Sequence, residues 1–182
     1  MAGKFGHHAT GVGAAMIAYA VVYEYKLDYG WFAAVAAYSG SSAPDWLEIP
    51  NVKKGWFGGV KRDGNGELIR TSVIPHRTIT HWLPAWIVFF VMSFIHISDN
   101  FLWGTGFGFA LGGLVHLLVD IPNPMGIPIF SPFHRYRLDA KFGRKQVGQP
   151  FGWWKSGEWD VALALVFGGI GYVSLKFVGA IS

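Results

Sequence analysis

Histidines and aspartates recur at the ends of the apolar segments of this 182-residue chain. His116 and Asp120 are four residues apart, so on a helix they share one face and both side chains reach the same ion. Neutral imidazole and carboxylate are ligands that suit zinc and similar divalent metals. The spacing therefore indicates part of a metal site.

Further candidate ligands come from other segment ends. His76 and His81 are five residues apart, about 140° on an ideal helix, so they do not share a face if both are helical. Pro75 places His76 at the helix start or in the loop before it. A lone histidine near a membrane surface is usually a hydrogen-bonding residue, but convergence from separate segments favours a metal site. The predicted ligands, for one or two zinc ions or another divalent metal, are His7, His8, Asp45, His76, His81, His116 and Asp120, with His7 and His8 as alternatives.

Composition limits the classes of protein that can hold such a site. Hydrophobic residues make up 52% of the chain and charged residues 14%, against roughly 25% charged in soluble domains. Mean hydropathy is +0.32, and there are 9 tryptophans. This balance excludes a disordered chain and a nucleic-acid-binding tail, and it indicates a membrane protein with interfacial aromatic residues. Cys is absent, which excludes disulfides, thiolate ligands and a thiol nucleophile.

The elements that position these residues are apolar segments, which predict an all-α, polytopic membrane helix bundle of about five membrane helices. We treat residues 1–182 as a single integral membrane domain. The last two segments meet the roughly 20-residue length of a membrane span, whereas the others must extend into polar ends, sit shallowly or pack inside protein. A secretory signal ending near Ala20 is an alternative for the first segment. The segments cover about 10–23, 31–43, 82–97, 101–119 and 161–180.

The basic residues predict an orientation. If the N-terminus is cytoplasmic and all five segments cross, 13 of the 15 lysines and arginines face the cytoplasm, leaving only Lys26 and Lys176. Two cytoplasmic insertions result, at about 48–75 and 121–158. In the first, the turn residues 63–66 separate 59–62 from 67–70, which predicts a small hairpin. Every histidine except His96 then lies on the cytoplasmic side.

Catalytic roles can be assigned to residues near the predicted ligands. Asp45 or Glu48 can act as general base, and Arg77 or Arg135 can stabilise a phosphate. For Arg135, a simpler interpretation is that the basic run around it binds anionic headgroups and sets the topology.

The motifs resemble the YdjM-like family, described as metal-dependent hydrolases of the inner membrane. Residues 76–81 fit a His-Arg-x-x-Thr-His signature, residues 116–120 fit His-x-x-x-Asp, and residues 126–133 resemble the Gly-x-x-x-x-x-Pro stretch that follows. Pro44-Asp45 matches the family's Pro-Asp. The family often has a second Asp two residues later, whereas this chain has Leu47 there and Glu48 as the next carboxylate. The resemblance implies a metal-dependent hydrolase in a bacterial inner membrane.

A looser similarity is to the zinc-dependent phospholipase C enzymes, which use an early His, an Asp, a His and then His-x-x-x-Asp in the same order. That similarity implies cleavage of phosphoester bonds, so we expect a phospholipase-like enzyme with a phospholipid or another headgroup-level substrate. Membrane lipid is the expected partner, nucleic acid is not, and a homo-oligomer is compatible with the sequence. The alternative is a non-enzymatic membrane protein whose structural ion site serves interaction or oligomer assembly.

Overall fold

The computed structural model describes residues 4–25, 27–47, 50–52, 70–72, 79–121, 127–128 and 160–182, and the structural statements below concern these residues. The chain is helical throughout this part except for one short pair of strands. In chain order the elements are α1 (Lys4–Glu24), α2 (Gly30–Gly40), α3 (Ala43–Trp46), β1 (Pro50–Val52), β2 (Arg70–Ser72), the 3-10 turn η1 (Ile79–His81), α4 (Leu83–Ile95), α5 (Phe101–Asp120) and α6 (Asp160–Phe177).

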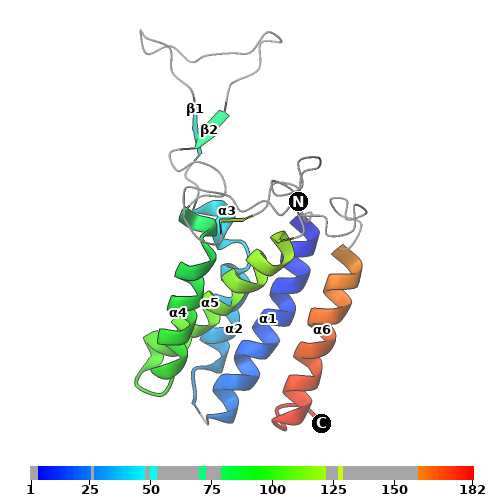
Figure 1. The fold of residues 1–182 in the computed structure, drawn as a ribbon. Helices are drawn as coiled ribbons and strands as arrows, with labels where there is room; N and C mark the ends of the chain where they lie inside the picture. Colours follow the sequence, from blue (N-terminus) through cyan, green and yellow to red (C-terminus); the bar gives the residue numbers. More distant parts are fainter. Residues whose placement is uncertain are drawn as a thin grey trace, which may run out of the picture.

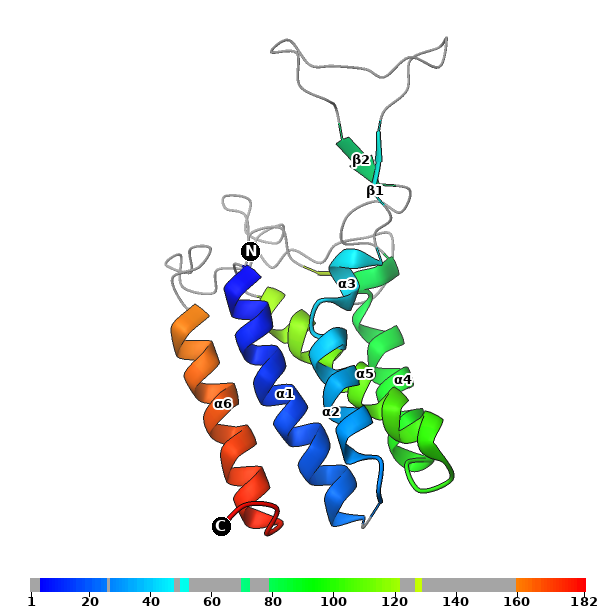
Figure 2. The same cartoon turned by 180° about the vertical axis from the view of Figure 1, so that it is seen from behind.

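The long helices lie side by side in a bundle (Figures 1 and 2). α1 packs between α6 and α2, and α5 packs against α2, α4 and α1. The N-terminus, α3, the end of α5 and the start of α6 lie at one end, and the C-terminus lies at the other. The chain order therefore brings four segment ends to the same end of the bundle.

Each predicted apolar segment forms a helix, so the all-α prediction is confirmed. By length and composition, α5 and α6 are the two described helices able to cross a membrane, and α4 is a shorter apolar helix of 13 residues. Twenty residues of α-helix extend about 30 Å, the thickness of the hydrocarbon core. Crossing by five helices stays a prediction.

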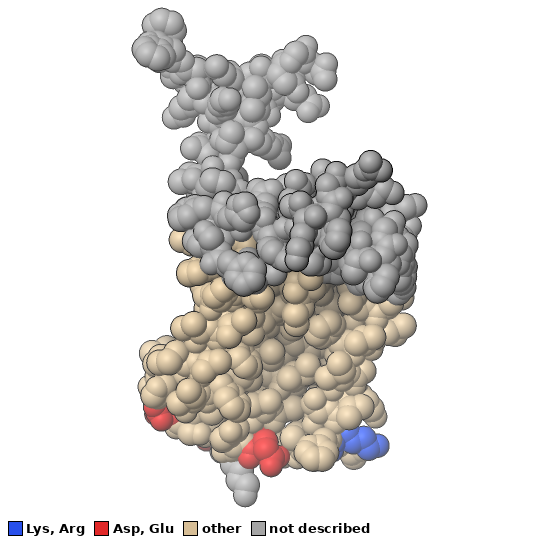
Figure 3. All heavy atoms as spheres, in the orientation of Figure 1, with Lys and Arg blue, Asp and Glu red and all other residues tan. Residues whose placement is uncertain are grey.

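On the face shown in Figure 3, the described helices carry no charged side chains over most of their length. Exposed large side chains include Val35 on α2, Val88 on α4 and Leu165 on α6. Exposed charged groups lie at the end of the bundle away from the N-terminus. Asp99 follows the last turn of α4, and Lys176 lies in the last turn of α6. Such a distribution fits a bundle that is surrounded by lipid.

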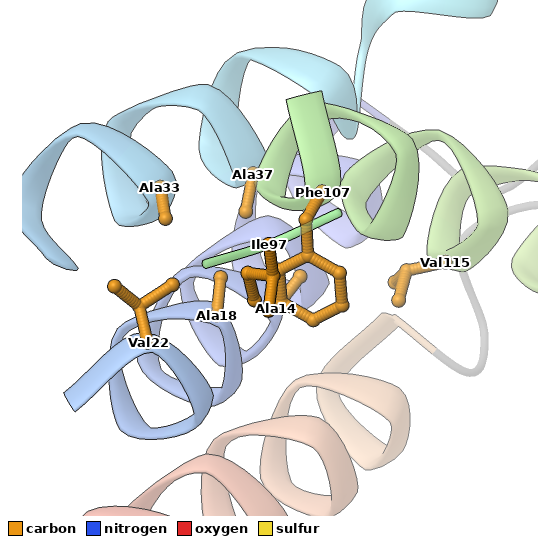
Figure 4. Close-up of a cluster of buried hydrophobic side chains, with 8 residues drawn as sticks. All are labelled: Ala14, Ala18, Val22, Ala33, Ala37, Ile97, Phe107 and Val115. Atoms are coloured by element: carbon orange, nitrogen blue, oxygen red, sulfur yellow. The ribbon is translucent and has the colours of Figure 1, made fainter. Parts of the chain in front are cut away.

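The core between α1, α2 and α5 consists mainly of small side chains (Figure 4). Glycines on α5 face carbonyl oxygens of α2: a Cβ on Gly108 would collide with the oxygen of Ala33, and one on Gly112 with that of Ala37. Small residues allow helix backbones in a membrane to approach closely. The result is that the last turns of α5 are held against the end of α2. The core cluster contains Ala14, Ala18, Val22, Ala33, Ala37, Ile97, Phe107 and Val115.

The first insertion contains an antiparallel pairing of β1 with β2, with Pro50 opposite Ser72 and Val52 opposite Arg70. This pairing closes the base of the segment in which the hairpin is predicted. The predicted turn at 63–66 lies outside the described residues, as does nearly all of the second insertion.

Candidate metal site

His116 lies in the last turns of α5, and its side chain is fully buried. Its Nδ1 is 2.8 Å from the carbonyl oxygen of Ser41, just after α2. A carbonyl only accepts hydrogen bonds, so Nδ1 is the donor and carries the proton of the neutral ring. The other nitrogen, Nε2, is then the one that can act as a metal ligand. Hydrogen bonding of the remote nitrogen to a carbonyl is typical of metal-binding histidines, because it fixes both tautomer and ring orientation.

Nε2 of His116 lies close to a second imidazole, that of His81, and to the carboxylate of Asp45. Oδ1 of Asp45 lies 3.4 Å from Nε2 of His81 and 3.8 Å from Nε2 of His116. The His81 and His116 rings are 5.3 Å apart between centroids and inclined at 66°, so they approach from different directions. Their ligand atoms are close enough to share one ion.

Asp120 contributes a second carboxylate, one helical turn after His116. Its Oδ2 lies 3.8 Å from Nε2 of His116 and 3.9 Å from Nε2 of His81. Its Oδ1 faces the other way, 3.6 Å from Nε2 of His7. The predicted i, i+4 pair therefore exists, and its carboxylate lies between two sets of imidazoles.

The structure separates the two alternative N-terminal histidines. His7 is buried, and its ring stacks on that of His116 with centroids 4.0 Å apart. His8 is exposed, and its Nδ1 lies 3.2 Å from the hydroxyl of Tyr38. His8 is therefore not part of the cluster, because successive residues of a helix point about 100° apart and only one of the two can face α5.

His81 ends η1 rather than opening the third long helix, which begins at Leu83. Its side chain is fully buried, and its Nδ1 lies 3.1 Å from the hydroxyl of Thr80. Thr80 is itself held by its carbonyl oxygen, which accepts a hydrogen bond of 2.7 Å from the indole N–H of Trp86 on α4. The short turn and the first turn of α4 thus hold His81 in place.

The cluster is buried on one side and open on the other. The side chains of His81, His116 and Asp120 are at most 1% exposed, whereas that of Asp45 is 40% exposed. Burial raises the pKa of the Asp45 carboxyl, but the contact with His81 and the nearby His116 and His7 lower it by more, so this pKa lies below its ordinary value. Asp45 is thus a charged carboxylate at the open edge of the cluster.

Asp160 is a buried residue of this region that the sequence analysis does not single out. It lies in the first turn of α6, and its Oδ2 accepts a hydrogen bond of 3.2 Å from the backbone N–H of Gly6, next to His7. A Cβ on Gly6 would come within 2.5 Å of Oδ1 of Asp160. The signal in the sequence is an acidic residue at the start of a membrane helix, and its partner is 154 positions away.

The remaining predicted residues, namely His76, Glu48, Arg77 and Arg135, lie outside the described residues. Five of the predicted ligands are brought together: His7, Asp45, His81, His116 and Asp120. They come from α1, α3, η1 and α5. Three imidazoles and two carboxylates form a donor set that fits zinc or a similar divalent ion.

Comparison with known proteins identifies the family of the chain. No curated protein and no solved structure matches the chain. The family model described as YdjM inner membrane protein matches residues 1–179, which is nearly the whole length. The chain therefore belongs to the YdjM inner membrane protein family.

Proposed function

We propose that this inner membrane protein is a metal-dependent hydrolase that cleaves a phosphoester of a lipid at headgroup level on the cytoplasmic face. The observation that carries the proposal is the cluster of three buried histidines and two aspartates at one end of the bundle. Ionisable residues inside a membrane protein are costly and generally mark a functional site. Here they come from four separate elements and face one another.

The geometry favours one ion held by His81, His116 and Asp120, with the exposed carboxylate of Asp45 beside its open position. Nε2 of His81, Nε2 of His116, Oδ1 of Asp45 and Oδ2 of Asp120 are within 4 Å of one another along the measured pairs. An imidazole nitrogen binds a single ion, so His116 cannot serve two. His7 and Oδ1 of Asp120 remain as two ligands of a second ion, which needs at least one more donor, such as the predicted His76.

When bound, a divalent ion supplies Lewis-acid activation of water and of a phosphoryl oxygen. The chain's own residues supply the rest of the chemistry. Asp45, exposed and charged, is placed to accept a proton from the attacking water. The water oxygen forms a bond to phosphorus, the bond from phosphorus to the leaving oxygen breaks, and that oxygen takes up the proton that Asp45 accepted. We assign Glu48 as an alternative base and Arg77 or Arg135 to stabilisation of the phosphate charge.

The exposure of Asp45 supports catalysis over a purely structural ion. A structural site is usually closed by its ligands, whereas a catalytic site keeps one position open to solvent and substrate. The buried face of this cluster is formed by His7, His116 and Asp120, and the open face is at Asp45. A substrate has to enter from the side of α3.

The test combines metal content with turnover. Purified protein is analysed by plasma mass spectrometry and incubated with phosphatidylglycerol and with the soluble phosphodiester bis-p-nitrophenyl phosphate. We expect about one zinc or equivalent ion per chain and release of the headgroup or of nitrophenol, with both lost in His116→Ala. His8→Ala is the matched control, because His8 is outside the cluster, and it should retain both. Unchanged metal content in His116→Ala overturns the ligand assignment. Bound metal without hydrolysis of either substrate overturns the proposal that the protein is a hydrolase.

A further inference from the structure

A groove opens on the lipid-facing side of the bundle beside the candidate metal site. Its volume is about 370 Å³, within the range of pockets that hold small ligands. We propose that this groove binds one acyl chain of a membrane phospholipid whose phosphate lies at the cluster. The proposal rests on the proposed function and names the substrate class as a phosphoester that carries an acyl chain. The lining residues include Leu47, Ile79, Ala85, Trp86, Phe89 and Phe109.

The lining residues in the described part of the chain are uncharged and almost entirely apolar, with Thr80 as the polar exception among them. Leu47 is 37% exposed, Ile79 49% and Phe89 39%, so the groove opens outward rather than into the core. Among the described residues it lies where α3, η1, α4 and α5 meet. A hydrocarbon chain matches such a surface, because it brings neither charges nor hydrogen-bonding groups that would have to be satisfied.

The floor of the groove is held in a defined shape. Trp86 is 7% exposed, its indole N–H bonds to the carbonyl of Thr80, and its ring stacks with Phe109 at a centroid distance of 5.7 Å. Gly113 makes room for it, because a Cβ there would collide with the Trp86 ring. A floor that is formed before the ligand arrives costs little ordering on binding.

The groove joins the polar cluster directly. Thr80 lines the groove while its hydroxyl lies 3.1 Å from Nδ1 of His81. Leu47 lines it two residues after Asp45, the exposed carboxylate. An amphiphile placed here puts its anionic phosphate at the cation site and its uncharged chain in the groove. This complementarity is what selects a phospholipid over a soluble phosphoester.

A second groove serves as a reference. It measures about 510 Å³ and lies between α1, α2 and the C-terminal residues, with Ala15, Val35 and Ala180 among its lining. It is also apolar, yet none of its lining residues belongs to the cluster. Apolar character alone would predict equal lipid binding in both grooves, whereas our proposal predicts a specific lipid beside the cluster.

The experiment fills one groove at a time. Ala85→Phe narrows the proposed acyl site, and Ala180→Phe makes the same change in the reference groove. Zinc-loaded protein in detergent is titrated with dioleoyl phosphatidylglycerol, and bound lipid is counted by native mass spectrometry. We expect one lipid per chain, binding at least tenfold weaker in Ala85→Phe and unchanged in Ala180→Phe. Phe89→Ala, which removes a wall of the groove, should weaken binding several-fold and covers the case in which Ala85→Phe does not fold.

Equal lipid binding in wild type, Ala85→Phe and Phe89→Ala overturns the proposal, and so does an equal loss in Ala180→Phe. Native mass spectrometry separates intact lipid from its hydrolysis product by mass, so binding is counted independently of turnover. If the protein hydrolyses the soluble phosphodiester but binds lipid equally well with and without Ala85→Phe, the proposed function stands and the acyl-chain site is wrong. If Ala85→Phe alone weakens lipid binding but the protein hydrolyses neither substrate, the acyl-chain site stands and the proposed function is wrong.

Discussion

Oδ1 of Asp120, at the end of α5, lies 3.6 Å from Nε2 of His7, in the first turn of α1. This contact joins the first helix of the chain to a residue 113 positions later, and the other oxygen of the same carboxylate faces His81 and His116. Asp120 is therefore the residue on which both halves of the cluster depend.

We expect Asp120→Asn to reduce metal affinity strongly while the protein still inserts into the membrane. Residues behind the ligands typically contribute about 10–100-fold to metal affinity, so a direct ligand should contribute at least about 100-fold. The measurement is a competition titration with a zinc chelator. Asp99→Asn, an exposed carboxylate at the other end of the bundle, is the control and should have no effect. Equal affinity in both variants would remove Asp120 from the ligand set.

The close approach of α2 and α5 should be as important for the metal as the ligands themselves. A Cβ on Gly112 would collide with the carbonyl of Ala37 and come within 2.7 Å of the backbone nitrogen of Ser41. Gly112→Ala should push α2 away, disturb the hydrogen bond that His116 donates to the carbonyl oxygen of Ser41, and destabilise the protein by about 1–3 kcal/mol. Thermal unfolding and zinc titration measure the two effects. Gly168→Ala on α6 is the matched control, because nothing lies within 4 Å of a Cβ there.

Asp160 should stabilise the start of α1. The first amides of a helix lack partners within the helix, and Asp160 accepts a hydrogen bond from one of them, at Gly6. Hydrogen bonds to charged groups contribute about 1.5–3 kcal/mol, so Asp160→Ala should lower the unfolding temperature in metal-free protein. Asp160→Asn retains a side-chain oxygen that can accept the bond, so its unfolding temperature should fall by less. Asp28→Ala, an exposed acid near the opposite end of the bundle, serves as control; a loss of the same size in that variant would contradict the capping role.

Metal release on acidification should follow protonation of the histidines rather than of Asp45. The pKa of Asp45 lies below its ordinary value of 3.8, so its carboxylate stays charged until the pH falls through that lowered pKa, and its contribution persists above it. Free imidazoles protonate near pH 6.5, and a protonated ring does not bind metal. We expect zinc to dissociate as the pH falls from about 7 to about 5, measured by dialysis and metal analysis. An unchanged release profile in His116→Ala would contradict coordination by histidine.

Zinc should raise the unfolding temperature of wild type, and chelator should reverse the rise. A ligand present at about 100 times its Kd stabilises the folded state by about 2.7 kcal/mol. His81→Ala should abolish this response, whereas His8→Ala should retain it, because His8 is paired with Tyr38 outside the cluster. A full zinc response in His81→Ala would show that the ion binds elsewhere.

Local patterns in the sequence were enough to predict the helices and most of the candidate site. Apolar runs gave all five segments, since burial or lipid contact of a helix depends on its own composition. The pairing of His116 with Asp120 follows from the helical repeat alone. The family membership likewise follows from motifs that can be read along the chain.

Features that depend on helix rotation and helix contact needed the packed structure. Whether His7 or His8 faces the cluster depends on how α1 is turned against α5, and the neighbouring residues look equivalent in the sequence. Three features each join positions far apart along the chain: the hydrogen bond from His116 to Ser41, the cap that Asp160 provides for α1, and the groove beside Thr80. The partner in each case lies on another segment, so it is decided by how the helices pack against one another and not by a local pattern.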